Sequence, residues 1–243
     1  MSKSVNEILY TGFWKILDWV YPPVCAGCGE PGYRLCQSCK NEIRFFSDIE
    51  KGGNESFLVP SHIQLSNCTD VRFVAVYEGV IRECIHALKY ENNQALGEMF
   101  SEWMVDLVRN TQWQIDMVIP VPLSSQRVQQ RGYNQSALIA KPLALKLEVT
   151  YAPFGVRRIR NTPSQVGLSA QERRINVAGA FLANPKVVEG KHVMLVDDVS
   201  TTGATIGACA AALKVAKATD VYCLTVAGFP QNIPVTEGAL NQV

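Results

Sequence analysis

The feature that most constrains the fold of this 243-residue chain is the run from 193 to 205, which reads VMLVDDVSTTGAT. Four apolar residues lead into two adjacent carboxylates, a hydroxyl-rich turn with one glycine, and an alanine-rich stretch from Ala204 to Ala218. Such an apolar run is typical of a strand buried on both faces of a parallel sheet, and the alanine-rich stretch is typical of a following helix. The run therefore predicts a loop at the carboxyl end of a strand, directly before a helix.

This loop has the groups that bind a sugar phosphate. The first N–H groups of a helix lack intrahelical partners and the helix dipole favours negative charge, so the turn can point several N–H groups at one anion. Asp197 and Asp198 are acceptors suited to neighbouring sugar hydroxyls or to a hydrated Mg²⁺. A phosphate at the turn and a diol at the carboxylates describe a ribose 5-phosphate. The predicted phosphate-binding residues of the turn are Ser200, Thr201, Thr202, Gly203, Ala204 and Thr205.

The same run resembles the signature for phosphoribosyl pyrophosphate (PRPP) in type I phosphoribosyltransferases, including the paired acids and the TTGxT turn. The resemblance implies PRPP as the ligand, with Mg²⁺ on its pyrophosphate, and makes Asp197 and Asp198 the candidate catalytic residues. An ordinary buried strand followed by a capped helix is the alternative.

A second cluster lies near the N-terminus, where the pattern C-x2-C-x7-C-x2-C is formed by Cys25, Cys28, Cys36 and Cys39. Two such knuckles can wrap one ion tetrahedrally, and four thiolates suit Zn²⁺ or an iron–sulfur centre. No further local cysteine indicates a cluster-binding series, which favours structural Zn²⁺. Two redox motifs or two disulfides are the alternatives. We interpret the other four cysteines as small buried apolar residues: Cys68, Cys84, Cys209 and Cys223.

Composition allows one main core with a small appended module, since 47% of the residues are hydrophobic. A net charge of +1 gives no global attraction to nucleic acid or membrane. The N-terminal segment has charges among its apolar residues, which predicts a short amphipathic helix in a cytoplasmic protein, with no signal peptide or membrane span. The expected division is an N-terminal helix and zinc module over 1–46, a linker over 47–66, the α/β domain over 67–230 and a C-terminal tail over 231–243.

From position 71 onward, strand and helix patterns alternate, which predicts a mainly parallel sheet flanked by helices, with ligands at the strand carboxyl ends. Strands are expected at 71–77, 115–121 and 221–226, and helices over 80–107 and 135–147. Pro142 lies inside the last helix, where it predicts a kink or a split.

Cationic side chains indicate how the anion is held. Arg127 and Arg131, in a segment interpreted as a long loop, suit bidentate phosphate contacts. The segment 157–177 carries five arginines and is expected to be a mobile loop that can close over an anion. The alternative to a phosphate-binding role for Arg127 and Arg131 is that both are solvated side chains on the protein surface. Lys89 either reaches the PRPP site or only caps its helix, and the sequence does not decide between these positions.

Four segments carry a closer resemblance: PVPL, RGYNQ, TPSQVGLSAQERRIN and VDDVSTTGAT, in this order and downstream of the cysteine knuckles. They resemble the ComF family of competence-associated, phosphoribosyltransferase-like proteins, over about 25–226. The resemblance implies a type I phosphoribosyltransferase fold, an N-terminal zinc finger and a cytoplasmic role in handling DNA taken up during transformation or used as a nutrient. Single-stranded DNA and DNA-import or recombination proteins are the implied partners.

Three classes of function fit these observations. The first is an enzyme that transfers phosphoribosyl from PRPP to an unidentified nucleophile. The second is a DNA-processing accessory in which the zinc module and the arginine-rich loop bind single strands or a partner protein. The third is a PRPP-sensing regulator. No base-recognition region is legible in the sequence, and the near-zero net charge argues against strong non-specific DNA binding.

Overall fold

The computed structural model describes residues 22–47, 67–160 and 170–229, with isolated positions at 12, 19 and 65. The predicted N-terminal amphipathic helix, most of the predicted linker and the C-terminal tail therefore lie outside the described residues.

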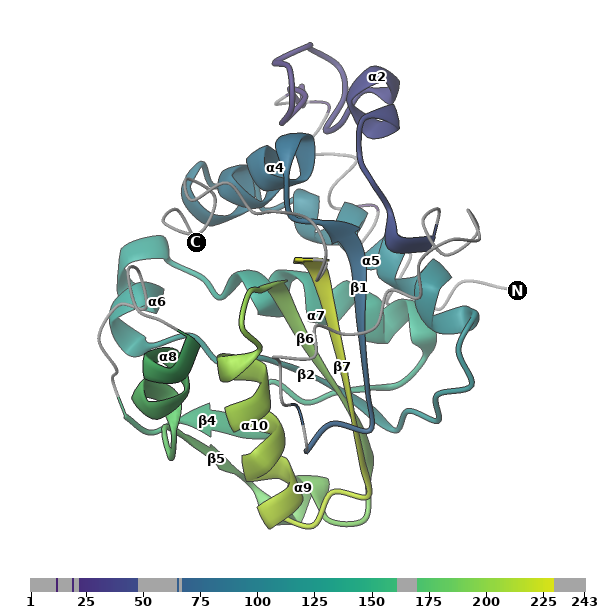
Figure 1. Ribbon diagram of the computed structural model, residues 1–243. Helices are drawn as coiled ribbons and strands as arrows, with labels where there is room; N and C mark the ends of the chain where they lie inside the picture. The colour runs from purple at the N-terminus through teal and green to yellow at the C-terminus, as the bar shows by residue number, and fades with distance from the viewer. Residues whose placement is uncertain are drawn as a thin grey trace.

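A five-stranded parallel sheet forms the centre of the molecule, in the strand order β1-β7-β6-β2-β3 (Figure 1). Its strands are β1 (Asp70–Val76), β2 (Met117–Pro120), β3 (Thr150–Tyr151), β6 (His192–Ser200) and β7 (Asp220–Gly228). The inner strands β6 and β7 are buried along almost their whole length because helices cover both faces. The predicted parallel α/β fold is confirmed.

Helices cover the two faces of this sheet. One face carries α4 (Gly79–Tyr90), α5 (Leu96–Arg109) and α7 (Gln135–Leu147), and the other carries α10 (Ala204–Val215) and α9 (Pro185–Val188). None of the helices in the described part of the chain is long and apolar enough to span a membrane. The remaining elements are α2 (Gln37–Asn41), α6 (Ser125–Arg131), α8 (Ala170–Val177) and the antiparallel pair β4 (Val156–Arg158) and β5 (Phe181–Ala183).

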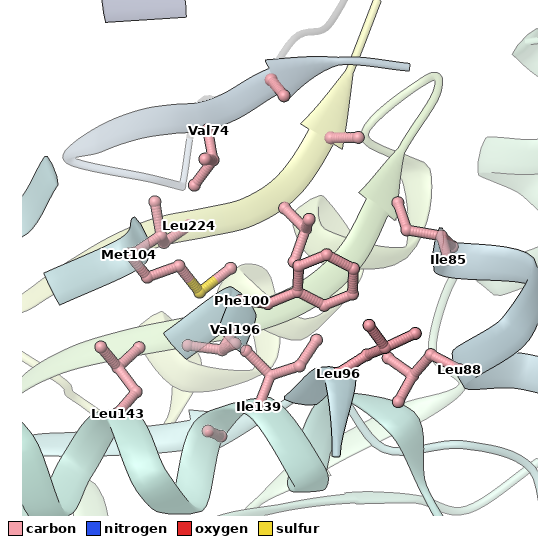
Figure 2. Close-up of a cluster of buried hydrophobic side chains, with 14 of the residues drawn as sticks. Val74, Ile85, Leu88, Leu96, Phe100, Met104, Ile139, Leu143, Val196 and Leu224 are labelled. Carbon is pink, nitrogen blue, oxygen red and sulfur yellow. The ribbon is translucent and has the colours of Figure 1, made fainter. Parts of the chain in front are cut away.

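The side chains of β6 alternate between the two faces. Met194 and Val196 pack in the cluster with α4, α5 and α7, whereas Val193 and Leu195 pack in the cluster with α10. Figure 2 shows the first cluster, where side chains from these helices converge on Val196. The same alternation puts Asp198 on the face that α4 covers.

Of the kink or split predicted at Pro142, the split is wrong, because α7 is one helix from Gln135 to Leu147, and the kink stays a prediction. Proline has no N–H, so the carbonyl of Leu138, four residues earlier, loses its helical donor. The neighbouring helix approaches at this point: a Cβ added to Gly97 of α5 would lie 2.7 Å from that carbonyl oxygen. Pro142 itself is buried. Close packing against α5 therefore supports α7 where a hydrogen bond is missing.

The two arginine-bearing segments are more regular than predicted. The first contains α6, which Ser124 caps and Gly132, with φ 80°, ends. The second begins in β4 and ends in α8, and 161–169 lies outside the described residues. Both segments were interpreted as loops because such short elements lack a hydrophobic period.

Three of the four scattered cysteines are buried apolar residues, as predicted: Cys84, Cys209 and Cys223. The interpretation was wrong for Cys68, which is only half-buried. Its Sγ lies 2.9 Å from the Sγ of Cys223, so it also has a thiol neighbour. The pattern missed this contact because the two residues are 155 positions apart and meet only through the pairing of β1 with β7.

Candidate functional site

β6 delivers Asp197 and Asp198 to the carboxyl edge of the sheet and continues through a turn at 201–203 into α10. Gly203 is the N-cap of α10 and has φ 70°, a left-handed conformation that favours glycine. The turn therefore brings the first N–H groups of a twelve-residue helix to the strand end, where an anion can accept from them.

Asp197 is buried and held by two donors. Its Oδ1 accepts a 2.7 Å hydrogen bond from Ser136 Oγ and a 3.0 Å hydrogen bond from the backbone N–H of Asp198. Ser136 lies in the first turn of α7, where Asn134 caps the helix by accepting from the Ser136 N–H. Burial, followed by the charge of Asp198, raises the pKa of Asp197 well above its ordinary value. The carboxyl group is thus fixed in orientation for hydrogen bonds with a ligand.

Asp198 pairs with a buried lysine. Lys89 Nζ lies 3.0 Å from Asp198 Oδ2, and both side chains are less than one-tenth exposed. Burial alone would raise the pKa of Asp198, but the charge and hydrogen bond of Lys89, together with Asp197 and Arg131, lower it. Burial would also lower the pKa of Lys89, and the Asp198 charge raises it instead. The pair is therefore ionic at neutral pH.

Arg127 and Arg131 reach the site from α6. Ser124 Oγ accepts a 3.4 Å hydrogen bond from the Arg127 N–H at the start of this helix. The guanidinium group of Arg131 is fixed, since it donates to Gln135 Oε1 at 2.9 Å and to Tyr90 Oη at 3.0 Å. α6 thus carries two cations to the carboxyl end of β2, next to the turn at 201–203.

Two further arginines reach the site from β4 and α8. Arg158 is half-buried, with its guanidinium carbon 5.5 Å from the ring centroid of Phe181. Burial, followed by the charge of Arg127, lowers the pKa of Arg158, so a nearby anion would stabilise its charged form. Arg173 is buried, and its Nη1 donates a 3.0 Å hydrogen bond to Thr201 Oγ1 in the turn before α10.

These side chains line one cavity of about 370 Å³. Within the described part of the chain, Ser200 Oγ is buried at this cavity without a hydrogen-bond partner. Native structures rarely leave a buried hydroxyl unpaired, so Ser200 has a donor available for a ligand. The charged lining has five cations and two carboxylates, which are Lys89, Arg127, Arg131, Arg158, Arg173, Asp197 and Asp198.

The structure brings all of the sequence-predicted PRPP and phosphate residues to this single cavity, from β6, the turn, α10 and α6. It also places Lys89 at the cavity, which the sequence left open. Sequence reasoning missed several further polar residues that line it, namely Ser124, Gln126, Gln130 and Ser136. Arg158 and Arg173 were counted only as members of a mobile loop. Ser136 follows directly on the RGYNQ segment, which is the sequence signal that could have indicated it.

The four cysteines of the N-terminal pattern meet at one point. Their Sγ atoms all lie within 4.8 Å of one another, and the sulfurs of Cys28 and Cys36 are 3.7 Å apart. Four thiolates at about 2.3 Å from a tetrahedral Zn²⁺ have neighbouring sulfurs about 3.8 Å apart. The arrangement therefore fits one zinc ion and does not fit two disulfides.

Backbone donors support this cluster. The Cys36 N–H donates to Cys25 Sγ at 3.3 Å, and the Cys39 N–H donates to Cys36 Sγ at 3.5 Å. Burial opposes ionisation of Cys25, but backbone N–H groups, led by that of Cys36, lower its pKa to about 6. Gly29, with φ 81°, makes the turn after the first knuckle. The local backbone thus stabilises the Cys25 thiolate, whereas burial raises the pKa of Cys39.

The zinc module packs on α4 and α5. Val80, in the first turn of α4, packs against the cysteines. Arg44 pairs with Glu78 at 3.1 Å, and Arg34 lies 4.0 Å from Glu98 of α5. Figure 1 shows α2 and its loop beside α4. The module therefore rests on the helix that carries Lys89 at its other end.

Two known domain families match this chain, one over the residues of the cavity and one over the cysteine cluster. Residues 86–235 match the phosphoribosyl transferase domain family, and residues 16–49 match the double zinc ribbon domain. The second match favours zinc over the iron–sulfur, redox and disulfide alternatives. The chain is thus a phosphoribosyltransferase-type protein with an N-terminal zinc ribbon.

Three similar proteins indicate which family within this class the chain belongs to. The DNA utilization protein YhgH of Escherichia coli is 36% identical over 159 residues, which are 62% of this chain and 69% of that protein. Competence protein F of Haemophilus influenzae is 30% identical over 186 residues, which are 71% of this chain and 80% of that protein. Competence protein ComFC of Bacillus subtilis is 24% identical over 189 residues, or 75% and 68% of the two chains. The chain belongs to the ComF family.

Proposed function

We propose that this protein binds PRPP, with Mg²⁺ on the pyrophosphate of the ligand, and acts in the handling of DNA that the cell takes up or uses. The observation that carries the first part is the cationic cavity at the carboxyl end of β6, where a helix N-terminus and the unpaired Ser200 hydroxyl meet two carboxylates. The names of the relatives, which refer to DNA utilization and competence, support the second part.

Each part of PRPP has a matching group in this cavity. The 5-phosphate would accept from the turn at 200–205, where Arg173 adds a charge-assisted donor beside Thr201. The ribose hydroxyls would donate to Asp197 and Asp198. The pyrophosphate would lie near Arg127 and the other arginines of the lining, whose planar donors suit phosphate oxygens.

Mg²⁺ belongs to this proposal because the two carboxylates are the hard oxygen donors that it prefers. When bound, the ion would offset the negative charge of the pyrophosphate. The side chains of the protein would bind and orient the sugar, and the fixed arginines would stabilise charge that develops on a pyrophosphate leaving group. A cytoplasmic location completes the proposal, since PRPP is a metabolite and reduced thiols suit a zinc site.

Calorimetric titration of the purified protein with PRPP and Mg²⁺ tests binding. The variant Asp197→Asn/Asp198→Asn should lose measurable affinity, because each change removes the negative charge and replaces one acceptor oxygen by a donor NH₂ group. Asp116→Asn is the matched control: its carboxylate accepts from the His192 N–H at the amino end of β6, away from the cavity. Equal PRPP affinity in the wild type and the double variant would refute the assigned role of the acid pair.

A second assay separates an enzyme from a PRPP-binding regulator. The protein is incubated with PRPP and a panel of bases, nucleotides and DNA ends, and released pyrophosphate is measured. Release that depends on one acceptor, and that disappears in the Asp197→Asn/Asp198→Asn variant, would establish transfer. PRPP binding with no pyrophosphate release for any acceptor in the panel would favour the sensing role.

A further inference from the structure

Lys89 is a buried cation that the proposed contacts with PRPP do not use. Its residue is only 8% exposed. Moving a lysine ammonium out of water is costly unless an anion pairs with it. A position in the last turn of α4 would allow Lys89 to offset the helix dipole. Its Nζ lies instead 3.0 Å from Asp198 Oδ2, at the wall of the cavity.

The helix that carries Lys89 is fixed near both ends. Close to its carboxyl end, Tyr133 Oη donates a 2.6 Å hydrogen bond to the carbonyl of the fully buried Leu88. At its amino end, Val80 packs against the zinc module. Lys89 is therefore presented to Asp198 by a helix with little freedom to move.

The geometry of the strand end explains why a cation is needed there. Asp197 and Asp198 are successive residues, and both are buried. Arg131 also lines the cavity, but its guanidinium group already donates to two neutral side chains. Among the ion pairs of the described residues, Lys89 is the cation that directly contacts one of these two acids. It cancels one negative charge before an anionic ligand arrives.

We infer that Lys89 is a positioning residue of the PRPP site, which holds the Asp198 carboxylate in one orientation toward the ribose hydroxyls. This inference rests on the proposed function. It assigns to α4 a role in ligand binding, although α4 itself is neither part of the PRPP motif nor close to it in sequence. Because Lys89 acts through Asp198, its loss should weaken PRPP binding even in a folded protein.

The test compares variants by PRPP calorimetry with Mg²⁺ and by thermal unfolding. Lys89→Met should weaken PRPP binding at least tenfold and lower the unfolding temperature, because Asp198 loses its partner. Lys89→Met/Asp198→Asn removes both charges, so it should recover stability without recovering affinity. A role in stability alone would restore both together. Lys146→Met is the matched control, since the Lys146 side chain is only 12% exposed and is also paired, with Glu98 and Glu102, but lies outside the cavity lining.

Wild-type affinity in Lys89→Met, measured below its unfolding temperature, would overturn the inference and leave the proposed function intact. Recovery of affinity in the double variant would also overturn it. An equal loss of affinity in Lys146→Met would show that loss of any lysine paired with carboxylates has this effect, again against a positioning role. Absence of PRPP binding by the wild-type protein would overturn both the proposed function and this inference.

Discussion

Replacement of Arg158 by Gln tests whether the arginine-rich segment serves the sugar phosphate or nucleic acid. Arg158 lines the cavity from β4, whereas its neighbour Arg157 is exposed and does not line it. Successive residues of a strand point to opposite faces, so the two arginines separate the two roles at almost the same position. Arg157→Gln is therefore a closely matched control.

The expected magnitude follows from the contacts of Arg158. A hydrogen bond from a charged donor contributes about 1.5–3 kcal/mol, so loss of one such contact to the ligand should weaken PRPP binding about 10- to 150-fold. The effect on stability should be smaller. The variant loses the contact with Phe181, about 0.5–1 kcal/mol at an exposed site, but burial and the charge of Arg127 already disfavour the guanidinium ion. These contributions oppose each other, so the unfolding temperature should change by only a few degrees.

Calorimetry with PRPP and Mg²⁺ measures the change in PRPP affinity. Titration with single-stranded DNA at several salt concentrations measures how DNA binding depends on salt. If Arg158 serves the sugar phosphate, PRPP affinity falls in Arg158→Gln alone and the salt slope of DNA binding is unchanged. A phosphate contact to single-stranded DNA would instead lower the slope of log affinity against log salt by about 0.7. Unchanged PRPP affinity together with a reduced slope in Arg158→Gln would refute the assignment of this arginine to the cavity.

Three further changes have distinct expected outcomes. Cys25→Ser/Cys39→Ser should lose its zinc by metal analysis and unfold at lower temperature, since structural zinc contributes roughly 10–16 kcal/mol to small modules and this module packs on α4; full zinc occupancy would contradict the site. Gly97→Ala should cost about 1–3 kcal/mol of stability, because its Cβ would lie 2.7 Å from Leu138 O, and should leave PRPP affinity unchanged. Gly203→Ala should weaken PRPP binding by about 5- to 30-fold, since a left-handed alanine costs roughly 1–2 kcal/mol; wild-type affinity would show that the turn does not need its glycine.

The parts of the fold that were predictable from sequence are those with strong local patterns. The apolar run before Asp197 and the alanine-rich stretch after Gly203 gave β6 and α10, because burial on both faces removes polar residues from a strand. Short elements such as β4 and α6 have too few residues to show a period. The split expected at Pro142 is absent for another reason: the packing that supports α7 comes from α5, which local sequence does not encode.

The candidate site also has a part that was predictable from sequence and a part that was not. Its acceptors and its turn lie within ten residues of one another, so one motif reveals them. Its cations do not: Lys89, Arg131, Arg158 and Arg173 come from four separate helices and strands. A positive charge acts over several ångströms and can reach a phosphate from many backbone positions, so no fixed spacing marks it. The carboxyl edge of a parallel sheet gathers such residues because the connections after its strands open onto that edge. The motif therefore indicates where the proposed ligand would bind, while the fold determines which cations surround that position.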